Sequence, residues 1–252
     1  MISKKILVDE IPLNIVLSDF FDEKEDTIVF LHWWGQNAKT FEKIMKEFEK
    51  EKRSFVSIDF PWFGLTPLPK WIWGVREYAL FIKSALDKIK IKKATFISHS
   101  FWWRVLIYLN NLHPEKIEKN IFIWWAGIKP EFSKSKLFII KLWKWVFKIP
   151  WLKKIWDKIR KKVSSRDYLA SWELQNIFLK VINEDLKNKI KNINTATLLI
   201  RWDKDDETPL EDWNYFHKNI GDSELLVLDW THFVYLEKHK EVLSKIQSFL
   251  KN

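Results

Sequence analysis

The chain contains no cysteine and unusually little glycine. Without cysteine it can form neither a disulfide bond nor a thiolate nucleophile, and a zinc site would have to be built from histidine and carboxylate side chains. An average soluble protein is about 7% glycine, about 18 residues for this length, but the chain of 252 residues has 5. Tryptophan is correspondingly abundant, with 17 residues, so the two residue types together amount to an ordinary glycine content.

Long apolar segments are also lacking. No stretch approaches the roughly 18 uninterrupted apolar residues of a membrane span. The N-terminus leads into a short strand-like run rather than into the apolar core of a signal peptide. We therefore expect a soluble, cytoplasmic protein, and its length suits a single α/β domain that carries an insertion.

Positive charge prevails, with a formal net charge of +10 at pH 7. Such a charge can attract nucleic acid or an anionic membrane, but by itself it describes solubility and nonspecific attraction. No nucleic-acid-binding motif accompanies it, so we expect no nucleic-acid partner.

Short apolar runs alternate with longer helical patterns, which is typical of βαβ units and of a mainly parallel sheet flanked by helices. Strands are predicted at residues 4–8, 13–17, 27–31, 55–58, 94–97, 121–123, 196–201 and 225–228. Helices are predicted at about 38–50, 75–89, 104–109 and 238–250. These elements predict an α/β fold with its core in residues 1–130 and 192–252.

The alternation stops between residues 131 and 191, where the sequence is helical in pattern and rich in lysine and aromatic residues. We interpret this segment as a helical cap insertion whose apolar face covers an active site. Its part 136–162 interleaves basic and apolar residues, a pattern that also suits contact with an anionic membrane surface.

One motif carries the chemistry. Residues 98–103 read Ser-His-Ser-Phe-Trp-Trp, directly after the apolar run 94–97 and directly before the helical pattern of 104–109. This strand, sharp turn and helix resemble the nucleophile elbow of the α/β-hydrolase superfamily, Gly-x-Ser-x-Gly followed by another glycine, with Ser100 as the nucleophile. The elbow turns so tightly that its flanking positions tolerate only very small side chains, and Trp102 stands at one of them.

Four other segments resemble glycine-bearing motifs of the same family. Residues 32–35 resemble its His-Gly-x-Gly loop, and residues 59–64 resemble its Asp-x-Pro-Gly-x-Gly loop. Residues 201–205 resemble x-Gly-x-x-Asp, and residues 229–232 resemble a glycine-bearing loop before a histidine. In each segment tryptophan stands where the family has glycine.

We therefore hypothesise that many of the tryptophans are glycine in the natural protein, encoded by UGA codons that mean glycine in the source organism. The alternative is that a tryptophan-rich protein evolved in this way. Trp34 and Trp73 are interpreted as true tryptophans, whereas Trp172 and Trp213 are weaker glycine candidates. The firmest glycine candidates are Trp33, Trp62, Trp102, Trp103, Trp202 and Trp230.

A serine nucleophile needs an adjacent base, which a carboxylate holds in the right tautomer. The chain supplies Ser100, Asp205 and His232 in the order found in α/β-hydrolases, and the last two follow predicted strands, so that all three would meet at the carboxyl edge of the sheet. Other acids crowd the loop of Asp205, and two other histidines compete with His232. These alternatives are Asp203, Asp206, Glu207, His217 and His239.

By the same resemblance, the backbone N–H groups of Trp34 and Phe101 form the oxyanion hole, and His32 supports the first of these loops. His99 is interpreted as a packed neighbour of the nucleophile. No metal ion or organic cofactor is expected.

These residues predict a serine hydrolase of carboxylesterase type that cleaves a small to medium apolar ester through an acyl-enzyme intermediate. The same triad also serves carbon–carbon bond hydrolases, peptidases and lactonases. The alternative from another class is a catalytically inactive binding or membrane-surface protein, in which Trp102 and Trp103 fill the site.

Overall fold

The computed structural model describes residues 1–123, 175–202, 210–228 and 239–251. By its contacts the chain divides into two compact units. The first comprises Met1–Ile128 with Glu184–Asn252, and the second comprises Lys129–Asn183.

The predicted cap, residues 131–191, stays a prediction, because most of it lies outside the described residues. Within it, α7 (Gln175–Ile182) belongs to the second unit, whereas the short helix α8 (Lys187–Ile190) belongs to the first.

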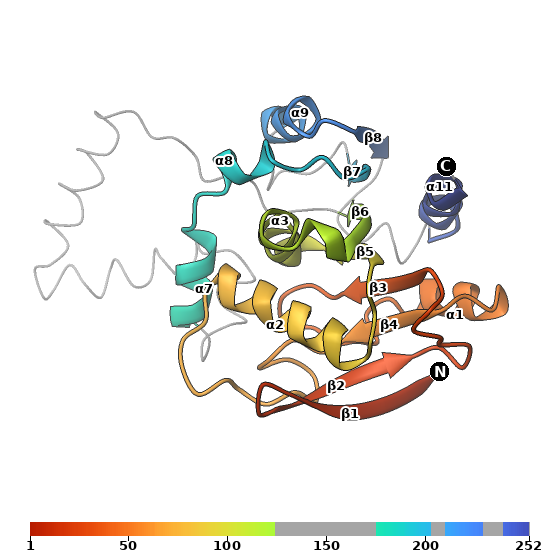
Figure 1. The fold of residues 1–252 in the computed structure, drawn as a ribbon. Coiled ribbons are helices and arrows are strands. Elements are labelled where there is room, and N and C mark those ends of the chain that lie inside the picture. The colour runs from red at the N-terminus through yellow and green to blue at the C-terminus, as the bar shows by residue number, and fades with distance from the viewer. Residues whose placement is uncertain (124–174, 203–209, 229–238, 252) are drawn as a thin grey trace, which may run out of the picture. The chain divides into compact units, whose positions relative to one another are not determined.

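The first unit is built on an eight-stranded sheet in the order β1-β2-β4-β3-β5-β6-β7-β8 (Figure 1). β1 and β2 pair antiparallel, as do β2 and β4, and the pairs from β4 through β8 are parallel. The predicted mostly parallel sheet is therefore confirmed. The strands are β1 (Ile2–Val8), β2 (Ile11–Leu17), β3 (Thr27–Leu31), β4 (Phe55–Ile58), β5 (Ala94–His99), β6 (Ile117–Ile123), β7 (Thr197–Trp202) and β8 (Ser223–Leu228).

The central strands are buried along their whole length. Every residue of β3, β4 and β5 is buried, which is expected of the near-continuous apolar runs in parallel strands that helices cover on both faces. The edge strand β1 is mostly exposed. The elbow at the end of β5 thus starts from a fully buried strand.

Helices cover both faces of the sheet (Figure 1). The apolar sides of α1 and α11 pack into one core cluster with Phe30, Ile97 and Ile121 of the strands, while α2 and α3 lie on the opposite face. Among its described residues, the α-helices of this unit besides α8 are α1 (Glu42–Lys50), α2 (Val75–Lys88), α3 (Trp103–Leu112), α9 (Leu210–Asn219) and α11 (His239–Lys251).

The first helix begins later than predicted, at Glu42 rather than at residue 38. The Asn37 side chain accepts a hydrogen bond from the Lys39 N–H at 3.0 Å, and the Asn37 carbonyl accepts one from the Thr40 N–H. An asparagine that bonds the backbone two residues onward favours a turn over a helix. The Ala38 N–H is also committed elsewhere, to the Asp59 carboxylate at 2.5 Å.

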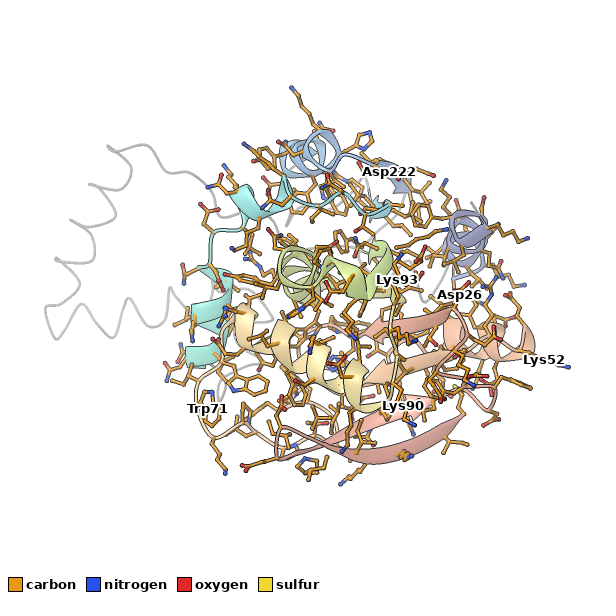
Figure 2. All side chains as sticks on the ribbon, viewed as in Figure 1. Asp26, Lys52, Trp71, Lys90, Lys93 and Asp222 are labelled. Carbon is orange, nitrogen blue, oxygen red and sulfur yellow. The ribbon has the colours of Figure 1, made fainter. Side chains whose placement is uncertain are left out.

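None of the described helices is long and apolar enough to cross a membrane. Large exposed apolar side chains gather instead in the segment after β4, where Trp71 is 64% exposed and projects from the surface (Figure 2). Leu65, Leu68 and Ile72 of the same segment are also exposed.

A buried amide pair joins α3 to the sheet, and its removal should be costly. The Asn110 and Asn120 side chains donate to each other at 3.1 and 3.2 Å, and Asn120 also donates to the Thr197 hydroxyl at 3.3 Å. Asn120→Ala leaves buried polar atoms without partners, so we expect it to lower the free energy of unfolding by about 2 kcal/mol. The measurement is urea denaturation. The exposed control Asn192→Ala should change it by less than about 0.5 kcal/mol, and equal effects of the two variants would contradict the interpretation.

Candidate active site

The predicted elbow has the geometry of a tight strand-to-helix turn. β5 ends at His99, a single turn of 3-10 helix (Ser100–Trp102) follows, and α3 begins at Trp103. Ser100 has a φ of +55°, in the left-handed region that residues other than glycine seldom adopt. Such strained positions cluster at functional sites. In a nucleophile elbow the strain presents the serine oxygen above the sheet.

The loops that follow β3 and β4 meet the elbow at the same edge of the sheet, because all three strands are parallel neighbours. Ring contacts record this convergence. The centroids of Trp33 and His99 lie 4.8 Å apart, and those of Trp34 and Trp102 lie 6.0 Å apart. Carboxyl ends of parallel strands are where open α/β sheets bind their ligands.

His32 connects two of these loops. Its Nε2 accepts a hydrogen bond from the Phe60 N–H at 3.2 Å, so its Nδ1 carries the proton and donates to the Trp33 carbonyl at 2.7 Å. Burial lowers the pKa of His32 to about 4. The ring is therefore neutral at pH 7, and its two hydrogen bonds join the loop after β3 to the loop after β4.

Asp59 connects the same loops to strand β2 through hydrogen bonds. Its buried carboxylate accepts hydrogen bonds from the Ala38 N–H at 2.5 Å, the Leu65 N–H at 2.8 Å and the Asn14 amide at 2.8 Å. A carboxylate with several such donors holds the chain segments that supply them in one arrangement. Sequence analysis identified residues 59–64 as a motif but not this clamp.

The two predicted oxyanion-hole residues lie on this edge. Trp34 is buried, with its ring centroid 5.0 Å from that of Phe63. Phe101 follows Ser100 directly in the turn before α3, so its N–H belongs to a helix N-terminus, where orphan donors and the helix dipole favour negative charge.

The other two members of the predicted triad, Asp205 and His232, lie outside the described residues. The strands before them are described. β7 ends at Trp202 and β8 at Leu228, and both run parallel to β5. Their carboxyl ends therefore share the sheet edge with the elbow.

One alternative base is disfavoured by its position. His217 is exposed, and its Nδ1 lies 2.9 Å from the hydroxyl of Ser223. Ser223 begins β8, at the amino edge of the sheet, whereas Ser100 follows the carboxyl end of β5. His217 thus lies at the wrong end of the strands to serve Ser100.

Arg104 is a feature that sequence analysis missed. It is buried in the first turn of α3, with its guanidinium 4.9 Å from the ring centroid of Trp103. It donates to the Glu184 carbonyl at 3.1 Å, while the Tyr108 hydroxyl donates to the Glu184 carboxylate. Burial lowers the pKa of Arg104 to about 10. The available signal was a single basic residue at the start of the apolar run of residues 103–109.

No family model matches the chain. The chain is 24% identical to the AB hydrolase superfamily protein YisY of Bacillus subtilis, over 88% of this chain and 90% of the relative. Among solved structures, MGS-M2, an α/β-hydrolase enzyme from a deep-sea metagenome library, superposes with a TM-score of 0.76 at 18% identity, over 99% of this chain and 98% of that one. An esterase from Exiguobacterium antarcticum superposes with a TM-score of 0.73 at 20% identity, over the whole of both chains.

The chain therefore has the α/β-hydrolase fold. The agreement of sequence and structure comparisons supports its assignment to the α/β-hydrolase superfamily.

The Asp59 clamp requires glycine at position 64. A Cβ there would lie 2.2 Å from an Asp59 carboxylate oxygen, and the φ of Gly64 is +58°. We expect Gly64→Ala to lower the free energy of unfolding by about 2 kcal/mol or more, measured by urea denaturation. Gly35→Ala, with a φ of +79° but no atom within 4 Å, should cost only about 1 kcal/mol. Gly221→Ala, whose Cβ would make an ordinary contact at 3.7 Å, should be nearly neutral. Equal changes in the free energy of unfolding for the three variants would contradict the role of Asp59.

The buried His32 should make the fold sensitive to acid. Its pKa is about 4 in the folded state and near its ordinary 6.5 in the unfolded state. The unfolded state therefore binds more protons in this range, and stability falls as the pH drops from 6.5 to 4, by about 3 kcal/mol in total. In His32→Gln, urea denaturation should give a flatter dependence on pH across that window. The exposed control His217→Gln should keep the slope of the parent, and an unchanged slope in His32→Gln would contradict the assignment.

Proposed function

We propose that the chain is a cytoplasmic serine hydrolase that cleaves small to medium apolar esters. The observation that carries the proposal is the left-handed conformation of Ser100 between the central strand β5 and helix α3. Hydrolase and esterase relatives of the same fold support a hydrolytic function, without specifying the substrate.

In the proposed reaction, the Ser100 oxygen attacks the ester carbonyl while His232 takes its proton and Asp205 steadies the resulting imidazolium. The tetrahedral intermediate expels the alcohol, which receives the proton from His232, and an acyl-serine remains. His232 then removes a proton from water, the water attacks the acyl-serine, and Ser100 leaves with the proton as the acid departs. The reaction uses no metal ion or organic cofactor.

The N–H groups of Trp34 and Phe101 would stabilise the negative charge that develops on the carbonyl oxygen. A preorganised donor of this kind is worth about 2.7 to 4 kcal/mol in the transition state. The contacts of His32 and Asp59 support the role of Trp34, because they fix the backbone of the loop that would present its N–H.

The many apolar residues of the 131–191 segment favour an apolar ester as the substrate. We propose no nucleic-acid partner, because the sequence contains no nucleic-acid-binding motif. The fold alone does not define the substrate, and a carbon–carbon bond hydrolase, a peptidase or a lactonase would use the same residues. Assay of a panel that holds a lactone, a peptide and a diketone beside model esters of increasing acyl length separates these classes from one another.

A second candidate is an inactive binding protein that has kept the fold. Two observations favour it. Ser100 is only 1% exposed, and apolar side chains that include Trp71 and Ile72 are exposed after β4 (Figure 2). Exposed apolar groups of this kind mark interaction sites in many proteins, membrane surfaces included.

Labelling with a fluorophosphonate probe distinguishes the two candidates. We expect an adduct on Ser100, no adduct in Ser100→Ala, and a fall in ester hydrolysis of at least about 10⁴-fold in Ser100→Ala and His232→Ala. His217→Ala, a histidine at the other edge of the sheet, is the matched control and should keep its activity. If neither the parent nor a variant with glycine at the six suspect positions is labelled at Ser100, the binding protein becomes the better interpretation.

A further inference from the structure

We infer that the protein made in its source cells carries glycine at positions 33, 62, 102, 103, 202 and 230, where the printed chain has tryptophan. The inference goes beyond the chemistry of the site to the composition of the loops around it. It deepens the proposed function, but its main evidence is backbone geometry and does not depend on catalysis.

Trp62 carries the argument. The Phe63 N–H donates to the Phe60 carbonyl at 2.8 Å, which closes a four-residue turn with Pro61 at its second position and Trp62 at its third. Trp62 has a φ of +79°, the largest positive value among the described residues other than glycine. A β-turn with proline second and a φ near +80° third is of type II, and its third position calls for glycine.

The neighbouring glycines show what this backbone normally contains. Gly35 has the same φ of +79°, and Gly64, two residues after Trp62, has a φ of +58°. For an L-residue the left-handed region is unfavourable because its Cβ comes too close to the following carbonyl oxygen, and a bulky residue there is a genuine outlier. The loop thus has the backbone of a glycine at position 62 and the side chain of a tryptophan.

Trp102 provides independent evidence from packing. Its ring lies face to face on Phe60, with a centroid distance of 3.5 Å and an interplanar angle of 7°. Aromatic pairs prefer offset or edge-to-face arrangements with centroids about 4.5 to 7 Å apart. Trp73, interpreted as a true tryptophan, meets this expectation, at 5.0 Å and 75° from Tyr78. The indole of Trp102 therefore lies in the face-to-face arrangement that aromatic pairs disfavour, whereas that of Trp73 has an ordinary edge-to-face contact.

The remaining positions rest on the family motifs and on the glycine and tryptophan counts. Trp103 packs on Phe216 at 5.1 Å in an ordinary edge-to-face contact. Trp33 is half-buried beside His99. The side chains of Trp202 and Trp230 lie outside the described residues.

The direct test compares the gene with the protein from its source cells. We expect UGA codons at positions 62 and 102, UGG codons at positions 34 and 73, and peptide masses that give glycine at 62 and 102. The peptide mass decides, because some genetic codes read UGA as tryptophan. Tryptophan at position 62 or 102 in the native protein, or UGG at either codon, overturns the inference.

The physical test measures the thermal stability of the protein with tryptophan at all these positions and of two variants, Trp73→Gly and Trp62→Gly. Replacing a buried tryptophan by a small residue normally destabilises a protein, and Trp73→Gly should lower the Tm by more than about 6 °C. Trp62→Gly should do the opposite and raise it by about 2 to 4 °C, because it removes the strain at φ +79°. A fall in Tm for Trp62→Gly comparable to that of Trp73→Gly overturns the inference.

The activity arm keeps this inference apart from the proposed function. Restoring glycine at all six positions should increase fluorophosphonate labelling of Ser100 several-fold over the printed chain. A glycine variant that is more stable but is not labelled would contradict the hydrolase and leave the glycine assignment standing. A variant that loses both stability and labelling would overturn the glycine assignment.

Discussion

A buried carboxylate that accepts hydrogen bonds from three neutral N–H groups connects the loops of the candidate site. The Asp59 carboxylate accepts hydrogen bonds from the Ala38 and Leu65 backbones and from the Asn14 amide. Buried donors without a partner are costly, so the Asp59 side chain stabilises the arrangement of the three segments that donate to it. The loop that would present the Trp34 N–H is held by contacts that do not involve the Ser100 side chain. The candidate edge is shaped largely by backbone hydrogen bonds, and neutral His32 joins two of its loops.

The parts of this fold that were predictable from sequence are the strands whose burial requires a continuous run of apolar residues. β3 and β4 have the predicted bounds because every residue in them is buried. β6 was predicted too short, since Glu118, Lys119 and Asn120 interrupt the apolar run while Lys119 and Asn120 still pair with β5. The start of α1 was missed because a side-chain bond at Asn37 outweighs helix periodicity, and such a bond leaves no periodic trace.

The residues of the candidate site also divide into those that could be predicted from sequence and those that could not. Ser100 was found because its flanking strand and helix are legible and its motif resembles a family. Arg104 and the clamp of Asp59 were not found, because each depends on partners far along the chain, Glu184 and Asn14 among them. A single sequence shows which residues are unusual, and only the fold shows which of them meet.

The turn at residues 60–63 extends this reasoning from chemistry to information. Handedness of the main chain is set by the whole surrounding structure, whereas the identity of a side chain is set by how one codon is read. When the two disagree at a single position, as at Trp62 with its φ of +79°, backbone stereochemistry becomes evidence about how a codon is read.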